Sequence, residues 1–341
     1  MLHAVANLYT GGSARLVVDL VEHLEDFEHA TVVRTAPPEP HYVGLELEEI
    51  PAIASVRAGR ALLRRLRPDL LHVHYLGHER DRYGRADREW YEPLFAAAAE
   101  DGYPVVENIN IPVPPYVSDS VARYVFVSDY VRRQFGADVH ASVTIYPGSN
   151  LHLFSRPDGA AAPNRCVGMV YRLEADKLDE TAIEVFVEIV RRRPGTKVVI
   201  VGGGRFLEPY RARVREAGMD HAFEFTAYVA YDDLPALYGR MSVFVAPPHS
   251  ESFGHVVPLA MGMAIPVAAY DVGALAEILG SRRTLAPAGD ARALAAKAVE
   301  LLDDDELRRR IGAENRERAR RLFSVEKMAA DYRGLYRELL G

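Results

Sequence analysis

The sequence predicts an α/β protein with parallel sheets, divided into two domains of similar architecture. Short apolar runs alternate with amphipathic segments from one end of the chain to the other, which is the pattern of βα units. The chain has 341 residues, more than one ordinary core of about 100–200 residues encloses. Residues 146–163 are rich in proline and glycine and interrupt any regular element, so we expect domains at 1–155 and 164–323.

The first domain is expected to begin with a strand at residues 3–8, a tight turn at Gly11 and Gly12, and a helix at residues 14–24. Leucine and valine recur on one face of that helix. The same pattern predicts strands at 31–34, 70–74, 105–109 and 124–128, and helices at 56–66, 90–100 and 129–135.

The second domain continues the alternation, without a repeat of fixed period. Its first strand, at residues 166–171, leads through a charged stretch into a helix at 180–193. Further strands are expected at 197–201, 223–227, 243–246 and 266–269, and further helices at 207–218, 234–240, 255–263, 291–302, 306–322 and 325–340.

Composition excludes several classes of protein. With 49% hydrophobic and 26% charged residues the chain is expected to fold as a globular protein. Its single cysteine, Cys166, excludes a disulfide scaffold and a cysteine-based metal site. The formal charge of −7 gives no overall attraction for nucleic acid. Neither a signal peptide nor an apolar run of about 18 residues is found, so we expect a cytoplasmic protein, with at most peripheral contact at the inner membrane face.

Two stretches could bind an anion. Gly11, Gly12 and Ser13 lie between a strand and a helix, where backbone amides approach a ligand closely; an ordinary turn with positive φ is the equal alternative. Arg172 and Lys177 follow a strand and precede a helix, and with the helix dipole they would suit a diphosphate. Solvated surface charge is the alternative for this pair.

Two further stretches follow later strands. The glycines at 202–204 lack the spacing of a dinucleotide site, and we expect them to let a strand end pass close to a ligand. Glu251 lies on the loop at 247–255, where a carboxylate would face the crevice at the strand ends. A helix-start carboxylate is its alternative role, and the amides after Gly254 would suit phosphate.

Together these stretches resemble the retaining, nucleotide-sugar-dependent glycosyltransferases of family 4, which have the GT-B architecture. The motifs that carry the resemblance are GGSARLVVDL at 11–20, PDLLHVHY at 68–75, YVFVSDYVRRQF at 124–135, YRLEADK at 171–177, VVIVGGGR at 198–205 and the segment at 223–267. The resemblance implies two Rossmann-like domains whose parallel sheets face a central cleft. It also implies that the helix at 324–341 crosses back onto the first domain.

By this resemblance the second domain would bind the donor. Arg172 and Lys177 would hold the diphosphate and neutralise it as the leaving group without a metal or other cofactor, Glu251 would contact the donor sugar, and Tyr228 would border the base. The residues implied in donor binding are Gly12, Arg172, Lys177, Gly203, Tyr228, Glu251, Ser252, Phe253, Gly254, His255, Val256 and Leu259.

The resemblance places the acceptor on the first domain's side of the cleft. Its expected contacts are Gly12, Ser13, His74 and Asn110. The expected partners are a UDP- or GDP-sugar, which gives up a hexose or aminohexose with retention by front-face attack, and a hydroxylated acceptor. No nucleic acid is expected, and the chain is expected to be a monomer or weak dimer.

Two positions depart from the family pattern. Leu259 stands where the family has a second glutamate, which removes a carboxylate expected at the donor ribose. The stretch that includes Asn108 and Asn110 stands where many relatives carry a histidine just after a strand of the first domain. A catalytically silent nucleotide-sugar binder and a sugar-nucleotide epimerase of GT-B architecture are therefore the alternatives to transfer.

Two other features have structural explanations. His72 and His74 are expected to point to opposite faces of their strand and not to share a metal ion. The arginine-rich helix at 56–66 is expected to present a solvated face, with an anionic membrane as the lesser alternative.

Overall fold

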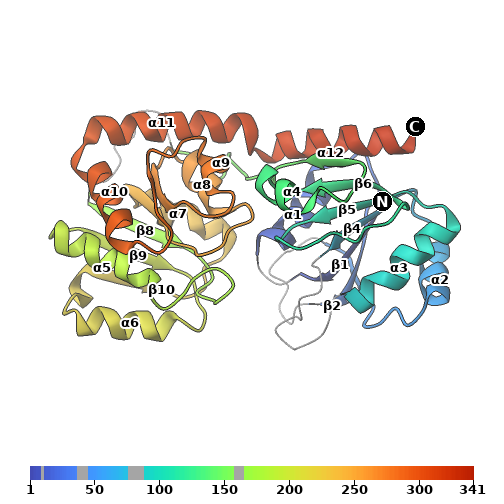
Figure 1. Cartoon of the computed structure of the whole chain (residues 1–341), viewed down its shortest axis with the longest axis horizontal. Helices are drawn as coiled ribbons and strands as arrows, with labels where there is room; N and C mark the ends of the chain where they lie inside the picture. The colour runs from blue at the N-terminus through green and yellow to red at the C-terminus, as the bar shows by residue number, and fades with distance from the viewer. Residues whose placement is uncertain (9–10, 37–44, 76–87, 157–164) are drawn as a thin grey trace. The chain divides into compact units, whose positions relative to one another are not determined.

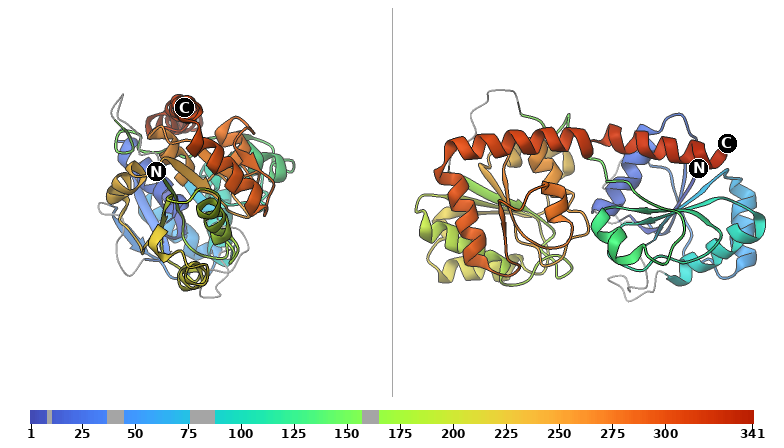
Figure 2. Two further views of the ribbon diagram at one scale, coloured as in Figure 1. Left: turned by 90° about the vertical axis from the view of Figure 1, so that its left-hand side faces the viewer. Right: turned by 45° about the horizontal axis from the view of Figure 1, so that its top comes forward.

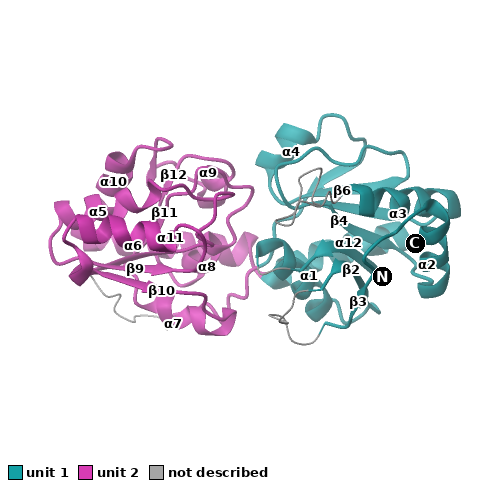
Figure 3. Cartoon of the chain, turned by 90° about the horizontal axis from the view of Figure 1, so that it is seen from below, with its two compact units in different colours: residues 1–148, 325–341 teal, residues 149–324 magenta. Residues whose placement is uncertain are grey.

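The computed structural model describes residues 1–8, 11–36, 45–75, 88–156 and 165–341. They form two compact units (Figure 3). Unit 1 comprises Met1–Gly148 and Val325–Gly341, and unit 2 comprises Ser149–Ser324. The chain therefore passes from one unit to the other twice. Pro157, Gly159 and Pro163, which contributed to the predicted boundary, lie outside the described residues.

Unit 1 contains a seven-stranded sheet in the order β3-β2-β1-β4-β5-β6-β7 (Figure 1). Every described pair of neighbouring strands is parallel. The strands are β1 (Leu2–Asn7), β2 (Ala30–Thr35), β3 (Leu47–Glu49), β4 (Leu71–Tyr75), β5 (Val105–Ile109), β6 (Val121–Phe126) and β7 (Ser142–Thr144). All residues of β4 and β5 are buried, as expected of central strands covered on both faces.

Helices cover both faces of this sheet (Figure 2). They are α1 (Gly12–His23), α2 (Val56–Leu66), α3 (Arg88–Asp101), α4 (Asp129–Phe135) and α12 (Val325–Leu340). Apolar side chains of α1 and α12 meet Val106 and Val125 of the sheet in one cluster. On α3, Tyr91 and Phe95 pack against Tyr75 of β4. Val106 is the neighbour of His72 in the register of β5 and β4, so the cluster with α1 and α12 lies on the face of β4 that carries His72. Tyr75 is three residues further along β4, so its contacts with α3 lie on the opposite face.

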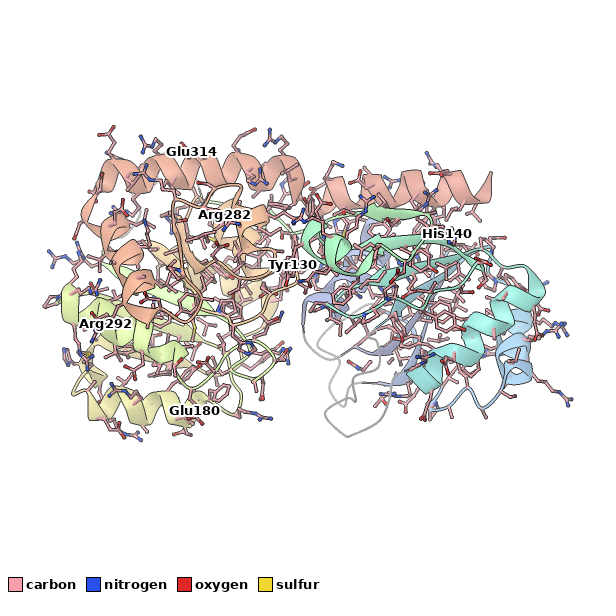
Figure 4. All side chains as sticks on the ribbon, in the orientation of Figure 1. Tyr130, His140, Glu180, Arg282, Arg292 and Glu314 are labelled. Atoms are coloured by element: carbon pink, nitrogen blue, oxygen red, sulfur yellow. The ribbon has the colours of Figure 1, made fainter. Side chains whose placement is uncertain are left out.

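Unit 2 contains a six-stranded parallel sheet in the order β10-β9-β8-β11-β12-β13. The strands are β8 (Cys166–Val170), β9 (Lys197–Val201), β10 (Phe223–Thr226), β11 (Val243–Ala246), β12 (Val267–Tyr270) and β13 (Leu285–Ala286). Its α-helices are α5 (Ala182–Arg192), α6 (Leu207–Glu216), α7 (Leu234–Gly239), α8 (Val256–Gly262), α9 (Leu275–Leu279), α10 (Ala291–Asp303) and α11 (Asp305–Leu322), and its 3-10 helices are η1 (Asp220–Ala222) and η2 (Tyr231–Asp233). Charged side chains such as Arg292 and Glu314 are exposed on α10 and α11 (Figure 4).

The predicted α/β class with parallel sheets is confirmed. Several elements match the expected bounds to the residue, among them α2, α4, β5, β9 and α12. The sequence did not predict β3, β7, β13, α9 or the two 3-10 helices. Each is at most five residues long, too short for an apolar period to stand out from its surroundings.

The described part of the chain contains no helix that is both long and apolar enough to cross a membrane.

Candidate functional site

In unit 2, a partly buried ion pair lies beyond the carboxyl ends of two adjacent strands. Lys177 follows β8 and Glu251 follows β11, and these strands are neighbours in the sheet. Lys177 Nζ donates a hydrogen bond to Glu251 Oε1 over 2.6 Å. The Glu251 side chain is 4% exposed, whereas that of Lys177 is 24% exposed. The carboxylate is therefore covered, whereas the lysine side chain still reaches solvent. The pair lies at the carboxyl ends of the strands, where parallel α/β folds bind ligands.

The backbone holds Glu251 in place through the turn after β12. Ala274 N donates to Glu251 O over 3.0 Å. A Cβ atom at Gly273 would lie 1.8 Å from the same oxygen, and Gly273 has a φ of +55°. At Gly254, φ is +85° and a Cβ atom would lie 3.1 Å from Glu251 Cγ. Both positions therefore require glycine, because the residue that carries the carboxylate lies directly against them.

Lys177 is fixed by its own turn and by the loop that carries Glu251. Its amide donates to Glu174 O over 3.1 Å, and its carbonyl accepts from His249 N over 3.0 Å. The His249 ring bonds the carbonyl of Ala175 through Nε2 over 2.9 Å. These bonds tie the turn at 174–178 to the loop at 247–251, so both ends of the ion pair are positioned by one hydrogen-bonded structure.

Arg172 lies in the same segment but has a different environment. It is exposed and pairs with Asp176 over 2.6 Å. The helix that follows Arg172 and Lys177 is α5, which begins at Ala182, two residues later than expected. Asp179 bonds the amide and hydroxyl of Thr181, and these residues form a turn between the cations and the helix.

The glycine run at 202–204 is explained by packing between strand ends. Gly202 and Gly204 have φ values of +128° and +141°. Their Cβ atoms would lie 1.9 Å from Tyr171 O and 2.5 Å from Leu173 O. The run lets the end of β9 touch the segment that leads to Arg172. Gly203 itself would have room for a Cβ atom, 3.8 Å from the amide of Tyr228, and the Tyr228 side chain is 53% exposed.

The other predicted donor residues surround the start of α8. Ser252, Phe253 and Gly254 are buried, and His255 and Val256 are half-buried. Phe253 packs edge-on against Phe323, with ring centroids 5.7 Å apart, and Tyr238 donates to the carbonyl of Val256 over 3.0 Å. Leu259 is 3% exposed and belongs to the core of unit 2. Leu259, which occupies the position of the family's second glutamate, therefore contributes to packing in this chain.

The predicted acceptor residues lie in unit 1. Gly12 is exposed and Ser13 half-buried at the start of α1, and Gly11 is extended with φ 167°, so a turn with positive φ is not seen there. Asn110 follows β5, and its Oδ1 accepts from Asn108 Nδ2. His74 is fully buried and bonds to His3.

The expectation for His72 and His74 is wrong. Both rings lie on the same face of β4, with centroids 4.1 Å apart. Residues two apart on a strand share a face, since side chains alternate with a period of two. His72 bonds to Tyr336 of α12, which covers that face.

The arginine-rich helix α2 pairs with acidic side chains of its own unit. Arg60 pairs with Glu100 and Asp101, Arg64 with Asp101, and Arg65 with Glu48. These pairs neutralise much of the positive charge and favour a solvated face over a membrane-binding one.

The sequence did not identify His249, Gly273 and Ala274 as parts of the site. The one feature of the sequence that could have indicated His249 is its position two residues before Glu251 in the same loop. The turn at 272–275 approaches Glu251 only in the folded sheet, through the neighbouring strand β12.

Comparison with known proteins agrees with this arrangement. An uncharacterized glycosyltransferase of Methanocaldococcus jannaschii is 22% identical over 346 residues, which covers 97% of this chain and 95% of that protein. Residues 155–318 match the family described as glycosyl transferases group 1. This match lies within unit 2. The predicted enzyme class, a glycosyltransferase that uses a nucleotide sugar, is thereby confirmed.

Two further likenesses show how far the family relation extends. This glycosyltransferase is 29% identical over 223 residues to the D-inositol 3-phosphate glycosyltransferase of Corynebacterium efficiens, and the match covers 60% of this chain and 52% of that protein. The crystal structure of HepE from Anabaena, in complex with UDP and glucose, superposes with a TM-score of 0.78 at 16% identity over 98% of both chains. The predicted GT-B fold, with two Rossmann-like domains, is confirmed.

Proposed function

We propose that the enzyme transfers a hexose or aminohexose, with retention and without a metal ion, from a nucleoside diphosphate sugar to a hydroxyl acceptor. The ion pair between Lys177 and Glu251 carries the proposal. The buried carboxylate of Glu251 holds the partly exposed side chain of Lys177 at the carboxyl ends of the strands. The ammonium group can bind a diphosphate there and keep its hydrogen bond to the carboxylate.

In the proposed reaction the bond between the sugar's anomeric carbon and the diphosphate oxygen breaks, and the acceptor oxygen bonds to that carbon on the same face. The acceptor's proton passes to the departing phosphate oxygen. Lys177 and Arg172 stabilise the negative charge that develops on the diphosphate. Glu251 holds the Lys177 ammonium group in position and contacts the donor sugar. No second carboxylate is required, unlike in retaining hydrolases.

The choice of donor and acceptor rests on the relatives. HepE was crystallised with UDP and glucose, which supports a UDP-sugar as the first donor to test. The Corynebacterium relative is named for an inositol phosphate, which supports a soluble, polyhydroxylated ring as the acceptor. Tyr228, exposed beside Gly203, is proposed to border the base, and Gly12, Ser13 and Asn110 to contact the acceptor.

The decisive experiment compares transfer from UDP-glucose and GDP-mannose to D-inositol 3-phosphate by the wild type, Lys177→Ala and Lys297→Ala, each with and without EDTA. Lys297 is a control, because it lies on α10 and pairs with Glu300 on the surface. We expect Lys177→Ala to lower kcat by about 10²–10³-fold, as loss of one charge-stabilising donor does, and Lys297→Ala to have no effect. EDTA is expected to leave transfer unchanged.

The burial of Leu259 motivates one alternative, a protein that binds nucleotide sugars without turning them over. Binding of UDP-glucose without product or hydrolysis across a panel of acceptors would establish that alternative. Conversion of the donor without an acceptor would instead identify an epimerase. Unchanged transfer by Lys177→Ala would exclude the leaving-group role of this lysine.

A further inference from the structure

Three histidines meet in the core of unit 1, whereas the proposed donor site belongs to unit 2. His3 lies on β1, and His72 and His74 lie on the adjacent strand β4. His3 and His72 are paired in the register of the two strands. All three side chains have no exposed surface. Two histidines at positions i and i+2 of one strand and a third on its neighbour form a tripod of imidazoles on one face of the sheet.

The ring nitrogens of this tripod converge. His3 Nδ1 lies 3.2 Å from His74 Nε2. One nitrogen from each of the three rings lies within 4.8 Å of one from each of the others. Nitrogens bound to one tetrahedral zinc ion at 2.0–2.1 Å stand about 3.3 Å apart. One pair, His3 Nδ1 and His74 Nε2, already has about that separation, and the third nitrogen lies within 4.8 Å of both partners.

Hydrogen bonds around the tripod determine where the lone pairs point. His29 Nε2 donates to the carbonyl of Leu24, so His29 Nδ1 accepts from His3 Nε2. The lone pair of His3 is therefore on Nδ1, which faces His74. His72 Nδ1 lies 2.7 Å from the Tyr336 hydroxyl, which leaves Nε2 as the nitrogen of His72 available to a ligand. Among the described residues, His72 Nε2 has no hydrogen-bond partner of good geometry, although the Asn108 side chain lies beside this ring.

A polar nitrogen left without a partner in the core is unfavourable, and a bound ion would satisfy it. Neutral imidazole is the form that binds transition metals. The bonds to His29 and Tyr336 resemble the outer contacts that orient metal-binding histidines through their second nitrogen.

We propose that His3, His72 and His74 bind one divalent transition-metal ion, with zinc as the ion best suited to three imidazoles. Zinc is not redox-active, and three imidazoles fill three of its four tetrahedral positions, which leaves the fourth for a small ligand such as water. The ion would join β1 to β4 beneath α12. It would take no part in the proposed transfer, whose charged groups all belong to unit 2.

The first test is the metal content of the untagged chain, produced in zinc-supplemented medium and passed through gel filtration. We expect one zinc per chain in the wild type and in His140→Ala, and almost none in His74→Ala. His140 is a matched control, because it is an exposed histidine of the same unit (Figure 4). A wild type that carries no metal, and gains none on refolding with zinc, would overturn the proposal. Zinc retained by His74→Ala would also overturn it, since the ion would then be bound elsewhere.

A second variant keeps the test decisive if His74→Ala fails to fold. Tyr336→Phe preserves the packed ring and removes only the hydroxyl that orients His72. Loss of such an outer contact weakens metal binding by about 10–100-fold, measured by competition with a chromophoric chelator. Replacement of zinc by cobalt should also give the visible absorption of tetrahedral Co²⁺. If Tyr336→Phe leaves zinc affinity unchanged, or if cobalt gives no such spectrum, the three histidines are only a hydrogen-bonded core cluster.

Discussion

Glu107 is a carboxyl group buried in the core of unit 1. It has no exposed surface, and its Oε1 accepts a hydrogen bond from Tyr116 N over 2.9 Å. Within the described residues Oε2 has no partner. Burial raises the pKa of Glu107 well above its ordinary value. The folded chain therefore keeps a proton on Glu107 over a pH range in which the unfolded chain has lost it.

This difference makes the free energy of unfolding depend on pH. Because the native state binds the extra proton, stability should fall as pH rises from the ordinary glutamate pKa through the raised one, by about 1.4 kcal/mol per pH unit within that window. Glu107→Gln should remove the contribution of this residue to the slope, so the stabilities of the two proteins should depend differently on pH. Trp90, the single tryptophan of the chain, lies in unit 1, so its fluorescence during urea unfolding measures the change. Equal slopes for the two proteins would show that Glu107 is ionised in the native state.

Gly254 links backbone conformation to the position of Glu251. Gly254→Ala introduces a left-handed alanine and a Cβ atom 3.1 Å from Glu251 Cγ. Gly218→Ala is a matched control, because Gly218 also has a positive φ, +70°, but open space around its Cβ position. Both variants should lose about 1–2 kcal/mol of stability from the backbone. Only Gly254→Ala should also raise the KM for the sugar nucleotide, and a similar KM in the two variants would show that Glu251 is not displaced.

At the scale of elements, α12 completes the core of unit 1. Its buried residues, with those of α1 and the sheet, form one cluster that includes Met328, Tyr332 and Tyr336. Met328→Ala should destabilise unit 1 by about 2–5 kcal/mol, the usual effect of deleting a large buried side chain. Lys327→Ala, which removes an exposed pair with Asp331, should change stability by at most about 0.5 kcal/mol. Trp90 fluorescence in urea distinguishes the two, and equal midpoints would mean that α12 docks without this contact.

The long elements could be predicted because burial imposes a period on the sequence. The faces of α1 and α12 and the apolar runs of β4, β9 and β11 show that period clearly. Short edge strands such as β7 have no such pattern, because their residues are only half-buried. The start of α5 was misplaced for a local reason. Aspartate is a common N-cap residue, but the Asp179 side chain bonds Thr181 in a turn before the helix.

At the scale of the whole molecule, the sequence placed Lys177 and Glu251 correctly at the ends of strands. Both follow apolar runs that were recognised as strands, and β8 and β11 are neighbours in the sheet. The direct bond between them, and the turn around Gly273 that supports it, depend on tertiary packing that no spacing encodes. The sequence analysis missed the histidine tripod because it placed His72 and His74 on opposite faces of their strand. Residues two apart on a strand lie on the same face, as these two rings do.

The discontinuity of unit 1 has a consequence for the order of folding on the ribosome. Unit 2 is continuous from Ser149 to Ser324, so all of its residues have been translated before α12 begins. The larger part of unit 1 is made first, yet its apolar surface that includes Leu16, Leu20 and Val125 stays uncovered until Val325–Leu340 emerges. The half of the enzyme that is translated first is therefore the last to become complete. During that interval the nascent chain exposes the surface that chaperones recognise.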